Sequence, residues 1–269
     1  MAACILASSS CATAETIGPS DLQLQPPDEL DFGTVSDVRD GDSIDVDVGG
    51  EIIAVRMIGV NANEEGECYS EEPHHYLIDR LIDTRVGVEI VATDQFERAL
   101  ANIWLEEELV NFTLVASGLA IAQTPGPENP NGAALVAAEQ EAHESGLGLW
   151  SETACGPGGP RPDVGFDFEG SVIDPQGADG DRLDDEYIVV VNNELEMVDI
   201  TGWTLRDESS RNRMTFPEGT TLAPGERIEV RSGCASRFSW CTGSPIWNND
   251  GDMALLLDES GNVVARARY

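Results

Sequence analysis

The chain has 269 residues, of which 50 are acidic and 15 are basic, and all the basic residues are arginine. The formal net charge is therefore −35. This length exceeds that of one small barrel and predicts two domains. The charge argues against tight binding of nucleic acid through a basic face. It predicts instead a solvated acidic surface suited to high salt or to an extracellular setting.

The N-terminal segment predicts export. Residues 1–12 are small and apolar and resemble the end of a secretion signal, although the basic start of such a signal is missing. A lipoprotein signal is one form of it, with Cys11, or alternatively Cys4, as the lipidated residue. Residues 13–31 are polar and contain prolines, as expected of a tether. We therefore expect an extracellular or cell-surface protein that an N-terminal lipid can attach to a membrane.

A nearly continuous apolar run follows the Gly49-Gly50 turn. Residues 51–60 predict a strand buried on both faces, and the glycine pair predicts a hairpin back to residues 34–48. Arg56 lies in the middle of this run. A guanidinium there is costly unless it pairs with carboxylates or is reserved for a phosphate, the alternative being that it extends to solvent from a strand edge.

The following elements read as a mixture of helices and strands. The pattern predicts helices over 70–83, 109–117 and 133–145, and a strand pair over 86–93 and 99–105 with Arg98 at the turn between the two strands. Upstream, Asp40-Gly41-Asp42 forms a turn whose acids suit a hard cation such as Ca²⁺. Alone this is a weak signal, because Asp-Gly-Asp is common in turns.

Three runs in a fixed order resemble the thermonuclease, or staphylococcal-nuclease-like, family: residues 40–43, 55–64 and 94–98. The resemblance covers 32–152 and implies a five-stranded barrel of the oligonucleotide-binding (OB) type with helices. It also implies that Asp42 is the main ligand of a calcium ion and that Asp40 supports it. Arg56 and Arg98 match the arginines that clamp the phosphate, and Glu64 matches the carboxylate that activates or positions the attacking water.

Several positions depart from the family's pattern. Asn61 stands where a second metal-binding Asp is typical, and Ala62 where Thr is usual, so the predicted metal set is Asp42, Asn61, Ala62 and Asp40 with reduced charge. Gln95 and Phe96 occupy the substrate-contacting positions at which the family often shows Lys and Tyr, which predicts a weak grip on substrate.

The cysteines outside the N-terminal segment predict two disulfides, in agreement with export. Cys68 follows the Glu64 loop and Cys155 follows the end of the first domain, so we expect them to pair. Cys234 and Cys241 are close in sequence and are expected to close a small loop. A zinc site is the alternative, but the chain has no Cys-x-x-Cys spacing.

A Gly/Pro linker over 153–163 precedes short β-rich segments that predict a β-sandwich. Residues 185–190, 201–207, 222–225 and 247–252 resemble the lamin-tail domain, an immunoglobulin-like fold, with a match over 164–269. The fold class expected for the whole chain is therefore mainly β with some α. The second domain has no histidine and no nucleophile–base pair, and we interpret it as a binding module for a surface, polymer or protein.

Two functions fit these observations. The first is an exported, monomeric, calcium-dependent nuclease that cuts DNA or RNA with little sequence preference. The second is a non-catalytic adhesion or nucleic-acid-capture protein whose metal site has degraded at Asn61. Retention of Asp42, Arg56, Glu64 and Arg98 favours the first.

Overall fold

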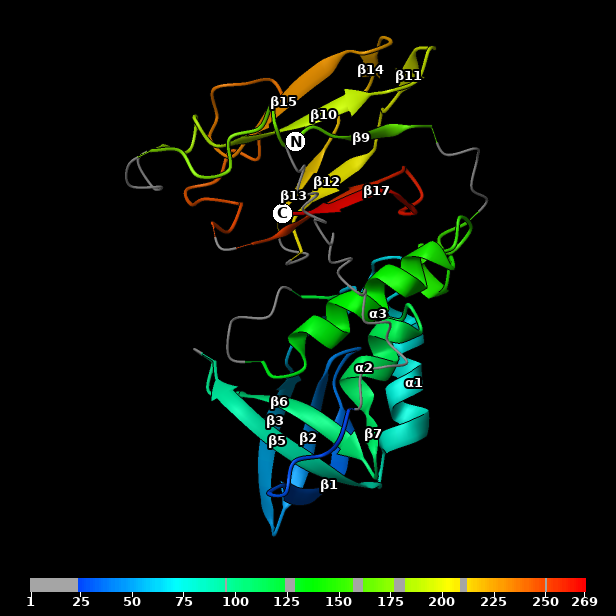
Figure 1. Ribbon diagram of the computed structural model, residues 1–269, viewed down its shortest axis with the longest axis vertical. Helices are drawn as coiled ribbons and strands as arrows, with labels where there is room; N and C mark the ends of the chain where they lie inside the picture. The colour runs from blue at the N-terminus through cyan, green and yellow to red at the C-terminus, as the bar shows by residue number, and fades with distance from the viewer. Residues whose placement is uncertain are drawn as a thin grey trace, which may run out of the picture.

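The computed structural model describes residues 24–94, 96–123, 129–156, 162–176, 182–208, 212–249 and 251–269. Two lobes are stacked along the long axis, a barrel with helices and a β-sandwich (Figure 1). The helix α3 (Gly132–Glu144) lies on the side of the barrel that faces the sandwich. In the described residues, no helix is long and apolar enough to cross a membrane. The predicted secretion signal at residues 1–12, with Cys4 and Cys11, lies outside the described residues.

Five strands close the barrel. The order is β3 (Glu51–Met57), β2 (Ser43–Val48), β1 (Asp31–Val38), β5 (Arg85–Thr93) and β6 (Ala99–Leu105), and β6 pairs back with β3. The neighbours are antiparallel except β3 and β6, which run parallel. This confirms the predicted OB-type barrel. A two-residue strand, β7 (Glu108–Leu109), extends β6.

The prediction of one long strand buried on both faces over 51–60 was wrong. Strand β3 ends at Met57, and only one of its faces enters the core, through Val55 and Met57. Ile52 is 54% exposed. The chain turns at Gly59, whose φ of +72° suits glycine, and continues as β4 (Val60–Asn61), which pairs with β8 (Ile121–Ala122). This separation puts Arg56 and Asn61 on different elements that fold toward each other.

The predicted helices are present. They are α1 (Glu71–Leu81), α2 (Val110–Ala116) and α3, followed by a 3₁₀ turn at Gly148–Trp150. Helix α1 begins with two glutamates that suit the positive end of the helix dipole, and it buries Leu77 and Leu81 against the barrel. The helices therefore complete one core with the barrel strands.

The C-terminal lobe is a sandwich of short strands, as predicted. One layer contains β15 (Arg227–Arg231), β10 (Tyr187–Asn192) and β9 (Val164–Phe166), with the pair β11 (Val198–Asp199) and β14 (Thr221–Leu222). The other layer has the order β13 (Arg213–Thr215), β12 (Thr204–Arg206), β16 (Met253–Leu257) and β17 (Val263–Arg268). Figure 1 shows that this second layer faces the barrel lobe.

Strand β16 reads Met-Ala-Leu-Leu-Leu because both of its faces are buried. Ala254 and Leu256 enter the sandwich core, whereas Met253 and Leu255 pack with Ile121 and Trp150 of the first domain. Because directly opposed residues in an antiparallel pair share a face, the registers Arg206↔Leu255 and Leu255↔Arg266 place these three side chains in one row on the layer that faces the barrel. The two domains therefore share an apolar cluster with arginines on both sides of it.

Both predicted disulfides are present in the structure. Cys68 pairs with Cys155 across 87 residues, with 5.5 Å between their Cα atoms, and Cys234 pairs with Cys241. The first bond ties the start of α1 to the segment that leaves the nuclease-like lobe. The zinc alternative is thereby excluded for these four cysteines.

Candidate functional site

The predicted site is built around a buried carboxylate at the end of the β1–β2 turn. The Oδ2 atom of Asp42 accepts the backbone N–H of Ala62 at 2.8 Å and Nη2 of Arg56 at 3.0 Å. Its Oδ1 accepts the hydroxyl of Ser43 at 3.1 Å. Asp42 is 6% exposed, and this burial raises its pKa to about 6 although Arg56 acts in the opposite direction. The carboxylate is thus near its titration point at mildly acidic pH.

Arg56 does not extend to solvent. Its Nη2 also donates to Oδ1 of Asn61 at 3.0 Å, and its Nη1 donates to the carbonyl of Val60 at 2.6 Å and that of Met57 at 3.1 Å. The guanidinium therefore lies between the carboxylate of Asp42 and the amide oxygen of Asn61. Two oxygens from separate elements converge on one positively charged group.

Two further residues of the predicted metal set contact Asp42 through the backbone. Oδ1 of Asp40 accepts the N–H of Asp42 at 3.0 Å, so Asp40 shapes the turn, and its charge contributes to the raised pKa of Asp42. Ala62 contributes the backbone N–H described above. A hollow of about 320 Å³ opens beside this turn and is also lined by Asn63 and His74.

Arg98 lies in the turn between β5 and β6, directly before the first residue of β6. The parallel register pairs Val55 with Ala99 and Arg56 with Leu100, so Arg98, one residue before β6, lies next to the row that contains Arg56. Nε of Arg98 donates to Asp94 at 2.8 Å, and its guanidinium lies 5.6 Å from the ring centre of Phe96. Phe96 is 58% exposed. The other predicted substrate contact, Gln95, lies outside the described residues.

Glu64 lies in an exposed loop at the boundary with the second domain. Its backbone N–H donates to Oε2 of Glu67 at 3.0 Å. Burial lowers the pKa of Arg206 in the sandwich to about 10 and also lowers the pKa of Arg213. The charge of Glu64 opposes both shifts. The structure thus brings Asp42, Arg56, Asn61 and Ala62 together directly, and it places Glu64 where the two domains meet.

A calcium ion in a protein is surrounded by several oxygen ligands. Among the described residues, no group of three or more His, Cys, Asp and Glu side chains is arranged to hold a metal. Asp42 and Asn61 nevertheless direct one carboxylate oxygen and one amide oxygen at the same positive group, Arg56. Carboxylate and amide oxygens are the kind of ligand that hard cations take, and this pair of oxygens carries a single negative charge.

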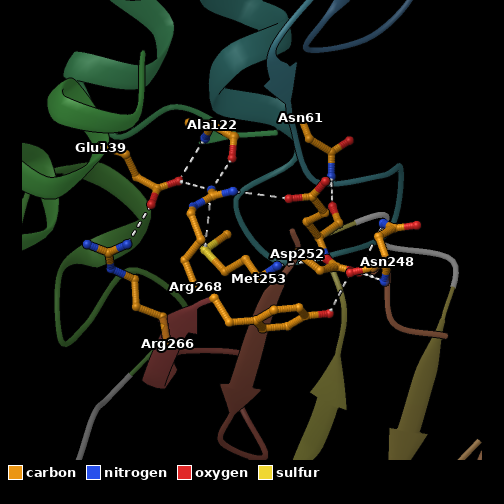
Figure 2. A network of polar contacts seen from close by, with 10 residues as sticks. Asn61, Ala122, Glu139, Asn248, Asp252, Met253, Arg266 and Arg268 are labelled. Atoms are coloured by element: carbon orange, nitrogen blue, oxygen red, sulfur yellow. Dashed lines mark hydrogen bonds and ion pairs between the residues drawn. The ribbon is translucent and has the colours of Figure 1, made fainter. Parts of the chain in front are cut away.

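The sequence did not indicate a polar network that joins the site to the sandwich (Figure 2). Nδ2 of Asn61 donates to the backbone carbonyl of Glu208, and the Glu208 carboxylate pairs with Nη1 of Arg268 at 3.2 Å. Arg268 also donates to the carbonyl of Ala122, the partner of Val60 in the β4–β8 pair. These contacts form a ring that returns to the strand carrying Asn61.

The same network contains a fully buried carboxylate on α3. Glu139 accepts the N–H of Ala122 at 2.8 Å and pairs with Arg266 at 2.6 Å and with Arg268 at 3.4 Å. Burial raises the pKa of Glu139, and the two guanidiniums oppose that rise. The alternating Ala-Arg-Ala-Arg pattern at 265–268 could have indicated this network, because it puts two arginines on one face of a strand.

The closed five-stranded barrel, with the ion pair of Asp42 and Arg56 beside its β1–β2 turn, is a domain of the OB type. Residues 54–152 match the family model for staphylococcal nuclease homologues, and residues 170–269 match the lamin tail domain. Similar curated proteins include "Thermonuclease" of Staphylococcus intermedius, 31% identical over 124 residues (43% of this chain, 74% of the relative). "Protein ParB" of Escherichia coli is 30% identical over 134 residues (45% and 72%).

A third relative, "Micrococcal nuclease" of Shigella flexneri, is 29% identical over 141 residues, which are 49% of this chain and 80% of the relative. The chain therefore belongs to the staphylococcal nuclease homologue family, and it carries a lamin tail domain after the nuclease-like domain. This confirms both resemblances stated from the sequence.

Proposed function

We propose that this protein is an exported, calcium-dependent nuclease that hydrolyses phosphodiester bonds of DNA or RNA with little sequence preference. The observation that carries the proposal is the convergence of Asp42 and Asn61 on Arg56. Family membership and the nuclease names of the relatives support it. The two disulfides support export, because such bonds persist in oxidising compartments.

Each of the predicted site residues has its own role in the proposed reaction. Asp42 and Asn61 would hold the calcium ion, which when bound polarises a phosphoryl oxygen. Arg56 and Arg98 bind the phosphate oxygens and stabilise the charge that develops on them. Glu64 accepts a proton from the attacking water. We propose that the lamin tail domain binds a surface, polymer or protein and localises the enzyme.

Two observations favour a second function. In the structure the oxygens of Asp42 and Asn61 are occupied by Arg56, and the protein carries a net charge of −35. A non-catalytic protein that adheres to a surface or captures nucleic acid would show the same features. The two functions differ in whether bonds are cut.

The test is hydrolysis of single-stranded and double-stranded DNA and of RNA by the purified chain, with calcium or with chelator, from low to molar salt. We expect calcium-dependent cleavage that Glu64→Gln lowers about 10²–10³-fold, the usual cost of losing one such group. Glu65→Gln is the matched control, because it removes the neighbouring exposed carboxylate. Binding without cleavage at every salt concentration would favour the capture function.

A further inference from the structure

The lamin tail domain contacts both ends of the loop that carries Glu64. This loop, residues 61–68, is called the Glu64 loop below. At its start, Asn61 donates to the carbonyl of Glu208. At its end, Cys68 is bonded to Cys155, whose backbone N–H donates to Oδ1 of Asn262 at 2.9 Å. Residues distant in sequence therefore fix where the loop begins and ends.

The middle of the loop is held by an arginine of β12. Nη2 of Arg206 donates to Oδ1 of Asn63 at 3.2 Å, and its Nη1 lies 3.6 Å from Oε2 of Glu67. The same Oε2 atom accepts the backbone N–H of Glu64 at 3.0 Å. Arg213 also pairs with Glu67, through the other carboxylate oxygen. A continuous chain of contacts thus runs from the second domain to the backbone of Glu64.

We propose that Arg206 is a positioning residue for Glu64: it fixes Asn63 and Glu67, and Glu67 in turn fixes the backbone of Glu64. The catalytic part of this inference rests on the role of Glu64 in the proposed function. The lamin tail domain is then a structural part of the nuclease site as well as a binding module.

Burial limits the screening of this contact. The side chain of Arg206 is 3% exposed and that of Glu67 is 15% exposed, so solvent and salt screen the pair weakly. The planar guanidinium reaches Asn63 and Glu67 with two different nitrogens, which a lysine ammonium on its flexible stem cannot reproduce. Glu64, Glu65 and Gly66 are exposed, so packing contributes little to their position.

The chain offers a matched control in the same row of side chains. Arg206 and Arg266 lie on opposite sides of Leu255 and face the same neighbouring domain. Arg266 pairs with Glu139 on α3 at 2.6 Å, and its side chain is 11% exposed. Replacing either arginine removes an ion pair between the domains, but of the two only Arg206 contacts the Glu64 loop, through a hydrogen bond to Asn63 and an ion pair with Glu67.

The experiment compares the full-length wild type with Arg206→Met, Arg206→Lys and Arg266→Met. The first readout is amide hydrogen exchange of residues 62–69, and the second is kcat and KM on single-stranded DNA with calcium. We expect Arg206→Met to speed exchange at least tenfold and to lower kcat at least tenfold with KM within twofold. Arg206→Lys should recover part of both losses. Arg266→Met should leave both within twofold.

Equal exchange in Arg206→Met and Arg266→Met would overturn the proposal, because the loop would then respond to domain contact in general. Faster exchange with unchanged kcat would overturn the catalytic role. If the wild type cleaves nothing, the proposed function fails, and exchange still decides whether Arg206 holds the loop. Should Arg206→Met not fold, Glu67→Ala breaks the same chain of contacts from the nuclease side and must speed exchange in the same way.

Discussion

Leu255 and Leu256 are adjacent in β16 but belong to two different cores, which makes them a sensitive test of the domain interface. Leu255 is 1% exposed and packs against the nuclease-like domain, and Leu256 is 0% exposed and lies inside the sandwich. Replacing either with alanine removes three buried carbon atoms, or about 2.4 kcal/mol of transfer free energy at about 0.8 per methylene. The cavity adds to this, for a total of about 3 kcal/mol in each variant.

The two equal losses should appear in different places. Leu255→Ala weakens docking, so amide exchange in the contacting segments around Ile121 and Trp150 should rise by about a hundredfold, the factor that corresponds to about 3 kcal/mol. Leu256→Ala should lower the unfolding free energy of the sandwich and leave those nuclease segments near their wild-type exchange rates. The assay is hydrogen exchange by mass spectrometry on both full-length variants. Identical exchange maps would refute the interface as described.

Three further predictions concern Asp42, Arg56 and Asn61. Arg56→Met should tighten calcium binding about tenfold at pH 8 in titration calorimetry. In the variant, a charge-assisted hydrogen bond of about 1.5 kcal/mol no longer competes for the oxygens of Asp42 and Asn61. Unchanged affinity would place the ion elsewhere. In the wild type, calcium affinity should be constant above pH 7 and fall about tenfold per pH unit below pH 6. The reason is that burial raises the pKa of Asp42 to about 6 and the ion needs the deprotonated carboxylate. A flat profile down to pH 5 would contradict this. Asn61→Asp should add charge for the ion but lower the unfolding free energy by about 1–3 kcal/mol in urea, because the donor to the Glu208 carbonyl is lost; an equally stable variant would argue against that contact.

Local features of the sequence predicted most of the first domain. The strand pair β5–β6 and the three helices followed from the sequence pattern, and the barrel followed from the resemblance to the family. The strand at 51–60 was predicted incorrectly, because an unbroken apolar run does not show which face is buried, and Ile52 is in fact 54% exposed. The glycine at position 59 was the overlooked sign that the strand ends there.

The sequence named candidate site residues but not the contacts that hold them. Asp42 and Arg56 were expected to act together, and the structure joins them directly. Arg206 and Glu208 were not predicted, because their partners in the first domain lie 143 and 147 residues away in sequence and no periodic pattern encodes such a distance. Contacts between domains depend on how two finished folds meet, which a single sequence does not reveal.

The structure gives a physical reason for the departure from the family pattern at position 61. An amide can act in two directions, and Asn61 uses both: its oxygen accepts from Arg56 at 3.0 Å while its nitrogen donates to the Glu208 carbonyl. A carboxylate at this position would direct an oxygen at that carbonyl and leave both acceptors without a proton between them. Nearby, the Glu208 side chain is buried and would add repulsion. Asn61 therefore carries one negative charge fewer than the Asp of the family pattern and also contributes a hydrogen bond to the docking of the lamin tail domain.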